Sequence, residues 1–328
     1  MRKISIDTLR GLACILLVGY HVAGGDPSSG LRLSDDHPIT DLNEVLSIIR
    51  MPLFSFLSGF VYAWRPYDGD SLRFFKGKAR RLLMPMLLVG TIFAMIQARM
   101  PGTNNQVENW FLLHIIPVAH YWFLESLFII FLVTALLEHY RLMSTPKRSA
   151  LVFFCASLLF VWAPLPHHLG LGGASYLFPF FLLGINANRF RDELEKALPW
   201  VVALFVLVSA YLVFFDGEVP QRNDELSLLV SATACIIVLS LKLEWPLVAA
   251  VGAESFVIFL FHSMFSSASR IALSAFGVKS VLVALPVGIL VGLVGPILVG
   301  KVLRKLPLGH WFIGEPRSSG ARAAHRAG

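Results

Sequence analysis

Residues 4–23 read ISIDTLRGLACILLVGYHVA, a mostly apolar run that carries three ionisable side chains, Asp7, Arg10 and His21. About 20 mostly apolar residues are what an α-helix needs to cross the hydrocarbon core of a bilayer. The basic residues in front of the run look like the start of a signal peptide. However, charges interrupt the run and further hydrophobic segments follow it, so we expect an uncleaved first membrane span.

The rest of the chain has the same character. Of its 328 residues 56% are hydrophobic and 15% are charged, whereas soluble domains carry about 25% charged residues. Mean hydropathy is +0.68. We therefore predict an all-α polytopic membrane bundle, with a transmembrane domain over residues 1–306 and a disordered cytoplasmic tail over residues 307–328.

Hydrophobic length predicts ten transmembrane helices. They lie at 4–23, 45–63, 82–98, 122–137, 150–162, 176–187, 198–215, 226–243, 247–265 and 281–299. With the N-terminus inside, 21 of the 28 basic residues fall in inner segments, as the positive-inside rule requires. Both termini are then cytoplasmic, and the protein is expected in the cell (inner or plasma) membrane. The net charge of +7 is explained by topology and lipid headgroups and does not indicate a nucleic-acid partner.

The ionisable residues of the first span are the strongest functional signal, because such groups are costly inside a membrane. The step of 11 residues from Arg10 to His21 leaves the two side chains only about 20° apart around a helix and about 16 Å apart along it. Both therefore face one side, with Arg10 near the inner end. Structural roles are the alternatives: Arg10 reaching the headgroups, His21 in the outer interface, and Asp7 simply pairing with Arg10.

The first span resembles the opening of the membrane-bound acyltransferase-3 family, whose motif is an arginine, ten intervening residues and a histidine. Here these are Arg10 and His21. Further segments, over residues 1–300, resemble motifs of that family in the same order: 52–60 with Ser58-Gly59, 74–85 with its basic residues, Trp122-Phe123-Leu124, 180–184 and 255–262. One departure is Phe259 to His262, which reads FLFH where a tyrosine-leucine pair is commoner.

The resemblance implies transfer of an acyl group, commonly acetyl, from cytoplasmic coenzyme A to a hydroxyl of a surface or exported glycan. Acetyl-CoA would be a co-substrate, and no permanently bound cofactor is expected. The phosphates of coenzyme A would meet the basic side chains Arg73, Lys76, Lys78, Arg80 and Arg81. These cations could also serve topology alone. Trp122 is a further candidate for donor binding, with an interfacial belt position as its alternative.

Histidine is the natural base for a sugar hydroxyl, so we predict that His21 takes the acceptor proton. Arg10 would steady the pantetheine arm or a developing negative charge, and Asp7 would hold Arg10 in place. Glu125 is a fourth catalytic candidate because it is a carboxylate inside a span. Direct transfer and an acyl-histidine intermediate both remain open.

Ser58 and His262 are candidate substrate-binding residues, although Ser58 could simply allow close helix packing and His262 could be a core histidine. No HExxH or similar spacing indicates a metal site, so none is predicted. A transporter or flippase is the alternative function. It would be indicated by repeats and broken helices in matched halves, which the sequence does not display.

Overall fold

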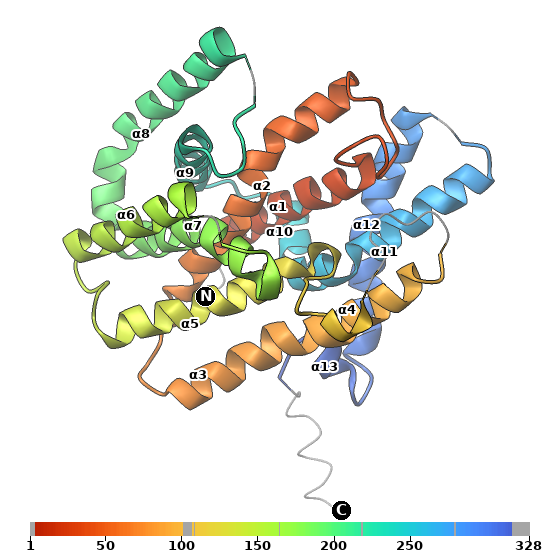
Figure 1. The fold of residues 1–328 in the computed structure, drawn as a ribbon, viewed down its shortest axis with the longest axis horizontal. Coiled ribbons are helices and arrows are strands. Elements are labelled where there is room, and N and C mark those ends of the chain that lie inside the picture. The colour runs from red at the N-terminus through yellow and green to blue at the C-terminus, as the bar shows by residue number, and fades with distance from the viewer. Residues whose placement is uncertain are drawn as a thin grey trace, which may run out of the picture.

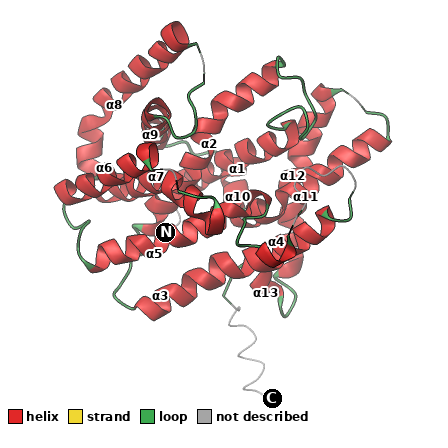
Figure 2. Cartoon of the chain, in the orientation of Figure 1, coloured by secondary structure: helices red, strands yellow, loops and turns green. Residues whose placement is uncertain are grey.

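The computed structural model describes residues 4–100, 107, 109–163, 165–217, 219–278 and 280–316. Across these ranges the regular elements are helices, and no strand is present (Figure 2). Eight helices in the same ranges are long and apolar enough to cross a membrane. The prediction of a polytopic helical bundle is confirmed.

The longer elements follow the predicted order. They are α1 (Ile4–Ala23), α2 (Pro38–Tyr62), α3 (Ser71–Lys78), a π-helical turn (Ala79–Leu83), α4 (Met84–Gln97), α5 (Trp122–His139), α6 (Pro146–Trp162), α7 (Leu171–Arg189), α8 (Arg191–Tyr211), α9 (Glu225–Ser240), α10 (Pro246–Ala253), α11 (Ser255–Ala275), α12 (Val281–Leu303) and α13 (Gly309–Phe312). Short 3₁₀ turns lie at Trp110–Leu112, Ala119–Tyr121 and His168–Gly170.

Side-chain caps fix several helix starts. The Asp70 carboxylate accepts a hydrogen bond from the backbone N–H of Arg73 at the start of α3, and Asp224 does the same for Leu226 in α9. Such caps satisfy N–H groups that have no partner within the helix. Pro38 and Pro146 occupy the first turns of α2 and α6, where the missing N–H costs nothing.

Each of the ten predicted spans overlaps helix, although most of the helices begin or end several residues from the predicted limits, and one predicted span is interrupted. The predicted span 247–265 is wrong in its limits, because the helix breaks at Glu254 into α10, of 8 residues, and α11, which continues to Ala275. With 8 residues α10 is too short to cross a bilayer. The helices α6 and α9 have 17 and 16 residues, and α4, with 14, continues the helical segment that begins at Ser71.

The centre of the bundle is made by α1, α2 and α7, with α2 packed against α7 and α1 against α10 (Figure 1). At the α2–α7 crossing a Cβ on Gly59 would lie 1.9 Å from the carbonyl oxygen of Phe181. A Cβ on Gly184 would lie 1.9 Å from the carbonyl oxygen of Phe56. Glycine at both positions therefore lets the two backbones touch, as small residues do between membrane helices.

At the edge of the bundle, at the upper left of Figure 1, α8 packs mainly against α9. An 18-residue window of the segment Arg191–Asp216, which contains α8, has a mean hydropathy of 2.4, and only 6% of that window is buried. An exposed helix this apolar is expected to face lipid.

The chain beyond α12 turns back onto the bundle. It forms α13, and Ile313 is buried against the core. The predicted disordered tail covered residues 307–328, but residues 307–316 are ordered in the structure. Residues 317–328 lie outside the described part of the chain.

Candidate active site

A cavity of about 620 Å³ lies between the first half of α1, the C-terminal part of α2, the end of α3 with the π-helical turn, and the first halves of α5 and α11. We call it the inner cavity. Four cations line it, Arg10, Arg65, Lys78 and Arg81, together with Ser58, Ser255 and mainly aromatic and aliphatic side chains. Among the described residues that line it, none is acidic. A pocket with four positive charges on apolar walls favours an anionic ligand with a long, less polar part.

The predicted pair of Asp7 and Arg10 lies at the inner cavity. The Arg10 Nη1 and Asp7 Oδ1 atoms are 3.4 Å apart, and Asp7 is buried. Ser58 lines the same cavity while its hydroxyl donates to the carbonyl oxygen of Phe54 at 2.8 Å. Three predicted site residues therefore come together at one place.

The predicted basic segment divides into two groups. Lys78 and Arg81 line the inner cavity, and the Arg81 guanidinium carbon lies 5.6 Å from the centre of the Phe256 ring. Arg73 instead lies 3.9 Å from Asp68 in an exposed ion pair, and neither Lys76 nor Arg80 reaches the cavity. The π-helical turn at residues 79–83 falls within this segment. Such a turn shifts the register of side chains and is frequent at functional sites.

Lys78 is held in an aromatic cage on the cavity wall. Its Nζ lies 3.4 Å from the centre of the Phe131 ring, 5.2 Å from that of Phe74 and 5.8 Å from that of Tyr62. Cation–π attraction fixes the ammonium in place without cancelling its charge. The cage therefore keeps one positive charge available to a ligand.

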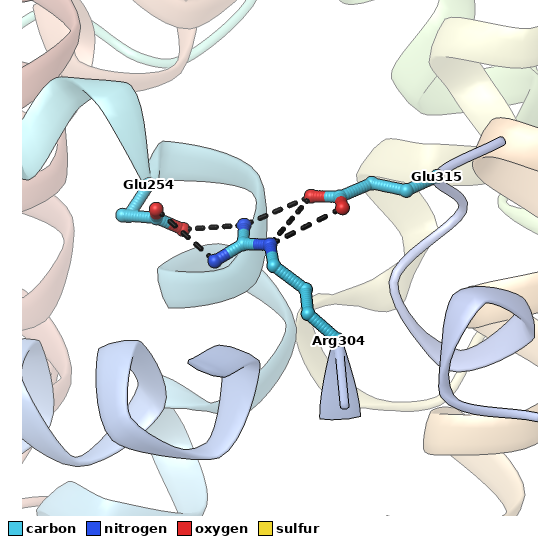
Figure 3. A network of polar contacts seen from close by, with 3 residues as sticks. All are labelled: Glu254, Arg304 and Glu315. Atoms are coloured by element: carbon cyan, nitrogen blue, oxygen red, sulfur yellow. Dashed lines mark hydrogen bonds and ion pairs between the residues drawn. The ribbon is translucent and has the colours of Figure 1, made fainter. Parts of the chain in front are cut away.

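A three-residue ionic network supports the inner cavity from the C-terminal side (Figure 3). The Arg304 guanidinium donates to Glu254, at 2.7 and 3.1 Å, and to Glu315, at 2.8 to 3.2 Å. These bonds raise the pKa of Arg304 further above its already high usual value. Gly314 packs against the backbone of Arg81, where a Cβ would lie 2.5 Å from the carbonyl oxygen. The network thus joins the break before α11 to the segment behind Arg81.

Three histidines meet farther along the bundle, and together with Ser263 we call them the imidazole cluster. His21 comes from α1, His120 from the turn before α5 and His262 from α11. Ring centres are 4.8 Å apart for His21 and His262, 4.6 Å for His120 and His262, and 5.8 Å for His21 and His120. The Ser263 hydroxyl lies 3.2 Å from both His120 Nδ1 and His262 Nε2.

The inner cavity and the imidazole cluster are neighbours. Phe259 lines the cavity, and its ring centre is 5.2 Å from that of His120. His262 follows Phe259 by three residues on α11, about one helical turn. Arg10 in the cavity and His21 in the cluster both lie on the inward side of α1, which is the arrangement that their spacing predicts.

Trp122 and Glu125 are not among the residues that line the inner cavity. The Trp122 ring lies under the guanidinium of Arg222, 4.7 Å from its carbon, and packs against Gly173. Glu125 is 5% exposed, and neither carboxylate oxygen has a hydrogen-bond partner within the described structure. The structure therefore separates these two candidates from the other predicted site residues.

Two polar residues near His21 were not predicted as site residues from the sequence. His120 lies just before the predicted span 122–137 and is buried, and the adjacent Tyr121 hydroxyl donates to the carbonyl oxygen of Leu260 at 2.7 Å, which ties this turn to α11. Arg50 is 4% exposed, donates to Asn43 and stacks 4.1 Å from the Tyr20 ring centre. Its position inside a predicted span was a usable signal, the same one that singled out Arg10.

Within the described chain, no group of three or more histidine, cysteine or acidic side chains is arranged to hold a metal ion. A family model described as an acyltransferase domain matches residues 3–301. No curated protein matches the sequence.

Proposed function

This chain belongs to the membrane-bound acyltransferase-3 family, and from that membership and the geometry of its site we propose that it acetylates a carbohydrate hydroxyl with acetyl-CoA as the donor. The coarser statement, a membrane acyltransferase, follows from the family match and the bundle of apolar helices. The donor, the acyl group and the acceptor glycan are the proposal.

One observation carries the proposal, namely a cavity lined by four cations that ends beside three imidazoles. Coenzyme A carries several phosphates on one end and a long, thin pantetheine arm on the other. Arg65, Lys78 and Arg81 would hold the phosphates, with the arginines able to form bidentate bonds. The arm would then run past Arg10 toward His21.

The transfer step needs a base at the acceptor hydroxyl and a stabilised charge at the thioester. His21 would take the hydroxyl proton as the acceptor oxygen attacks the thioester carbon. The carbon–sulfur bond then breaks, and the coenzyme A thiolate leaves with the bonding pair. Arg10, held by Asp7 at 3.4 Å, would offset negative charge on the donor during that step.

Purified protein in lipid vesicles, supplied with radiolabelled acetyl-CoA and surface glycan from the host cells, tests this proposal. We expect label in the glycan and an equal release of free coenzyme A, with neither in vesicles that lack the protein. NMR of the glycan should then display new O-acetyl signals. If a solute accumulates unchanged in the vesicles and no coenzyme A is released, the chain is a transporter and the proposal is wrong.

A further inference from the structure

Hydrogen bonding in the imidazole cluster fixes where the protons lie. His262 Nδ1 is 3.0 Å from the carbonyl oxygen of Ile258 and 2.8 Å from that of Phe259. A carbonyl oxygen can only accept, so Nδ1 must carry the hydrogen. In a neutral imidazole the other nitrogen is then a bare acceptor, and this leaves His262 Nε2 to receive a hydrogen bond.

Because Ser263 contacts both rings, the tautomer of His262 also determines that of His120. The Ser263 hydroxyl has a single hydrogen, and His262 Nε2 at 3.2 Å needs it. At its other contact, 3.2 Å from His120 Nδ1, the same oxygen must therefore accept. His120 consequently carries its hydrogen on Nδ1, and its Nε2 is an unprotonated acceptor.

That nitrogen lacks a donor within the described structure. His120 Nε2 is buried and has no hydrogen-bond partner there, and leaving a buried acceptor unpaired is costly. Two neighbouring donors are already used, since the Tyr121 hydroxyl donates to the carbonyl oxygen of Leu260 and the His262 N–H to two carbonyl oxygens.

His21 is the neighbouring ring that can supply the missing hydrogen. Its centre is 5.8 Å from that of His120, and the two rings meet edge-on at 61°. Two imidazoles joined by a straight N–H···N bond have centres about 5.2 Å apart, from an N···N distance of about 2.9 Å. A shift of the His21 side chain that moves its ring centre about 0.6 Å toward His120 would close the difference.

We propose that His120 is a positioning residue for His21, accepting the His21 N–H at its bare Nε2. This rests on the proposed function, in which His21 is the base. The bond would fix which His21 nitrogen carries a hydrogen and leave the other free for the acceptor proton, the role that an orienting partner has for a catalytic histidine. When His21 becomes charged, the chain through Ser263 and His262 to the two carbonyls would share the charge.

Two amide substitutions separate this role from simple packing. In His120→Gln the amide oxygen reaches about as far as Nε2 and can still accept from His21. In His120→Asn the amide reaches only as far as Nδ1 and can still serve Ser263. We expect kcat to fall about tenfold to a hundredfold in His120→Asn and less than about fivefold in His120→Gln, from the loss of a bond to a charged group. The KM for acetyl-CoA should be unchanged in both.

His114→Asn is the matched control, because His114 bonds Thr91 at 2.9 Å and lies outside the imidazole cluster. Its kcat should stay at the wild-type value. If His120→Asn is as active as His120→Gln or more so, His120 only holds Ser263, and the proposal is overturned while acyl transfer by the wild-type protein still stands. Absence of transfer by the wild-type protein would overturn the proposed function and this proposal together.

A spectroscopic measurement covers the case in which the substitutions prevent folding. The ¹⁵N NMR spectrum of the wild-type protein should contain two neutral histidines protonated at Nδ1, His120 and His262, whose signals both shift in Ser263→Ala. If only one of the histidines that respond to Ser263→Ala is protonated at Nδ1 and the other is protonated at Nε2, the assigned tautomer of His120 is wrong and the proposal fails.

Discussion

The inner cavity and the imidazole cluster lie on the two sides of Phe259 but are built from opposite kinds of polar residue. The cavity has three arginines and a lysine among apolar walls. The cluster has three imidazoles joined through one hydroxyl. Guanidinium groups bind an anion by attraction and stay charged, whereas imidazole is the side chain whose ordinary pKa lies near neutral pH. In the proposed function, donor binding therefore belongs to the inner cavity and proton transfer to the imidazole cluster.

One helix contributes to both regions. Arg10 belongs to the inner cavity and His21 to the imidazole cluster, and α1 joins them without a break from Ile4 to Ala23. In the proposed function, this rigid helix would fix the distance between the bound donor and the base, as precise positioning requires. Substitutions on the two sides should therefore change different kinetic constants.

The largest expected effect is on the imidazole side. Replacing His21 by alanine removes the base and should lower kcat about 10²-fold to 10⁴-fold, the usual range for general base catalysis. The KM for acetyl-CoA should stay within about twofold, because the cavity cations are untouched. Steady-state kinetics in vesicles measures both constants. A large rise in KM with a normal kcat would reverse the assignment of the two regions.

A charge removed from the cavity should act on donor binding. Arg81→Gln should raise the KM for acetyl-CoA about tenfold to a hundredfold, since hydrogen bonds to charged groups are each worth about 1.5–3 kcal/mol. Arg80→Gln is a control of the same chemistry one residue away, outside the cavity lining, and should change KM by less than about twofold. Equal effects at the two positions would mean that only the net charge of the segment matters.

Lys78 should have a smaller effect of the same kind. Lys78→Met keeps most of the aromatic packing and removes the charge, so the KM for acetyl-CoA should rise about threefold to tenfold at low salt. Lys76→Met is the matched control, because Lys76 does not line the cavity. Added salt should shrink the difference between the two variants. A difference that persists unchanged at high salt would argue for packing rather than charge.

The sequence predicts local features of this site well and distant ones poorly. Residues 4–23 are mostly apolar, and α1 has those same limits. Arg10 and His21 share a face because both lie on that single helix. By contrast, Glu254 is a single acidic residue inside the apolar run 247–265, and its role at the helix break depends on Arg304, its partner fifty residues later. The burial of His120 likewise depends on α11, which is distant in sequence.

The same limit applies to the basic segment. Five cations there are equivalent as a charge pattern, yet only Lys78 and Arg81 line the cavity. Two features lie where the lining residues part from the other cations: the π-helical turn, which contains Arg81, and the packing of Gly314 against the Arg81 backbone. Both features depend on backbone register and on contacts made by residues beyond α12.

The smallest expected effect tests whether those contacts matter for the cavity. Glu315→Gln weakens the network around Arg304, which is partly exposed, so its loss is worth at most about 1 kcal/mol after solvent screening. Through the displaced segment behind Arg81, we expect the KM for acetyl-CoA to rise about twofold to fivefold while kcat is unchanged. Asp68→Asn breaks the more exposed pair with Arg73, away from the cavity, and should leave KM at the wild-type value. If Glu315→Gln lowers kcat instead, the C-terminal segment acts on the imidazole side through α11, and the division of labour between the two regions is less complete than the cavity lining indicates.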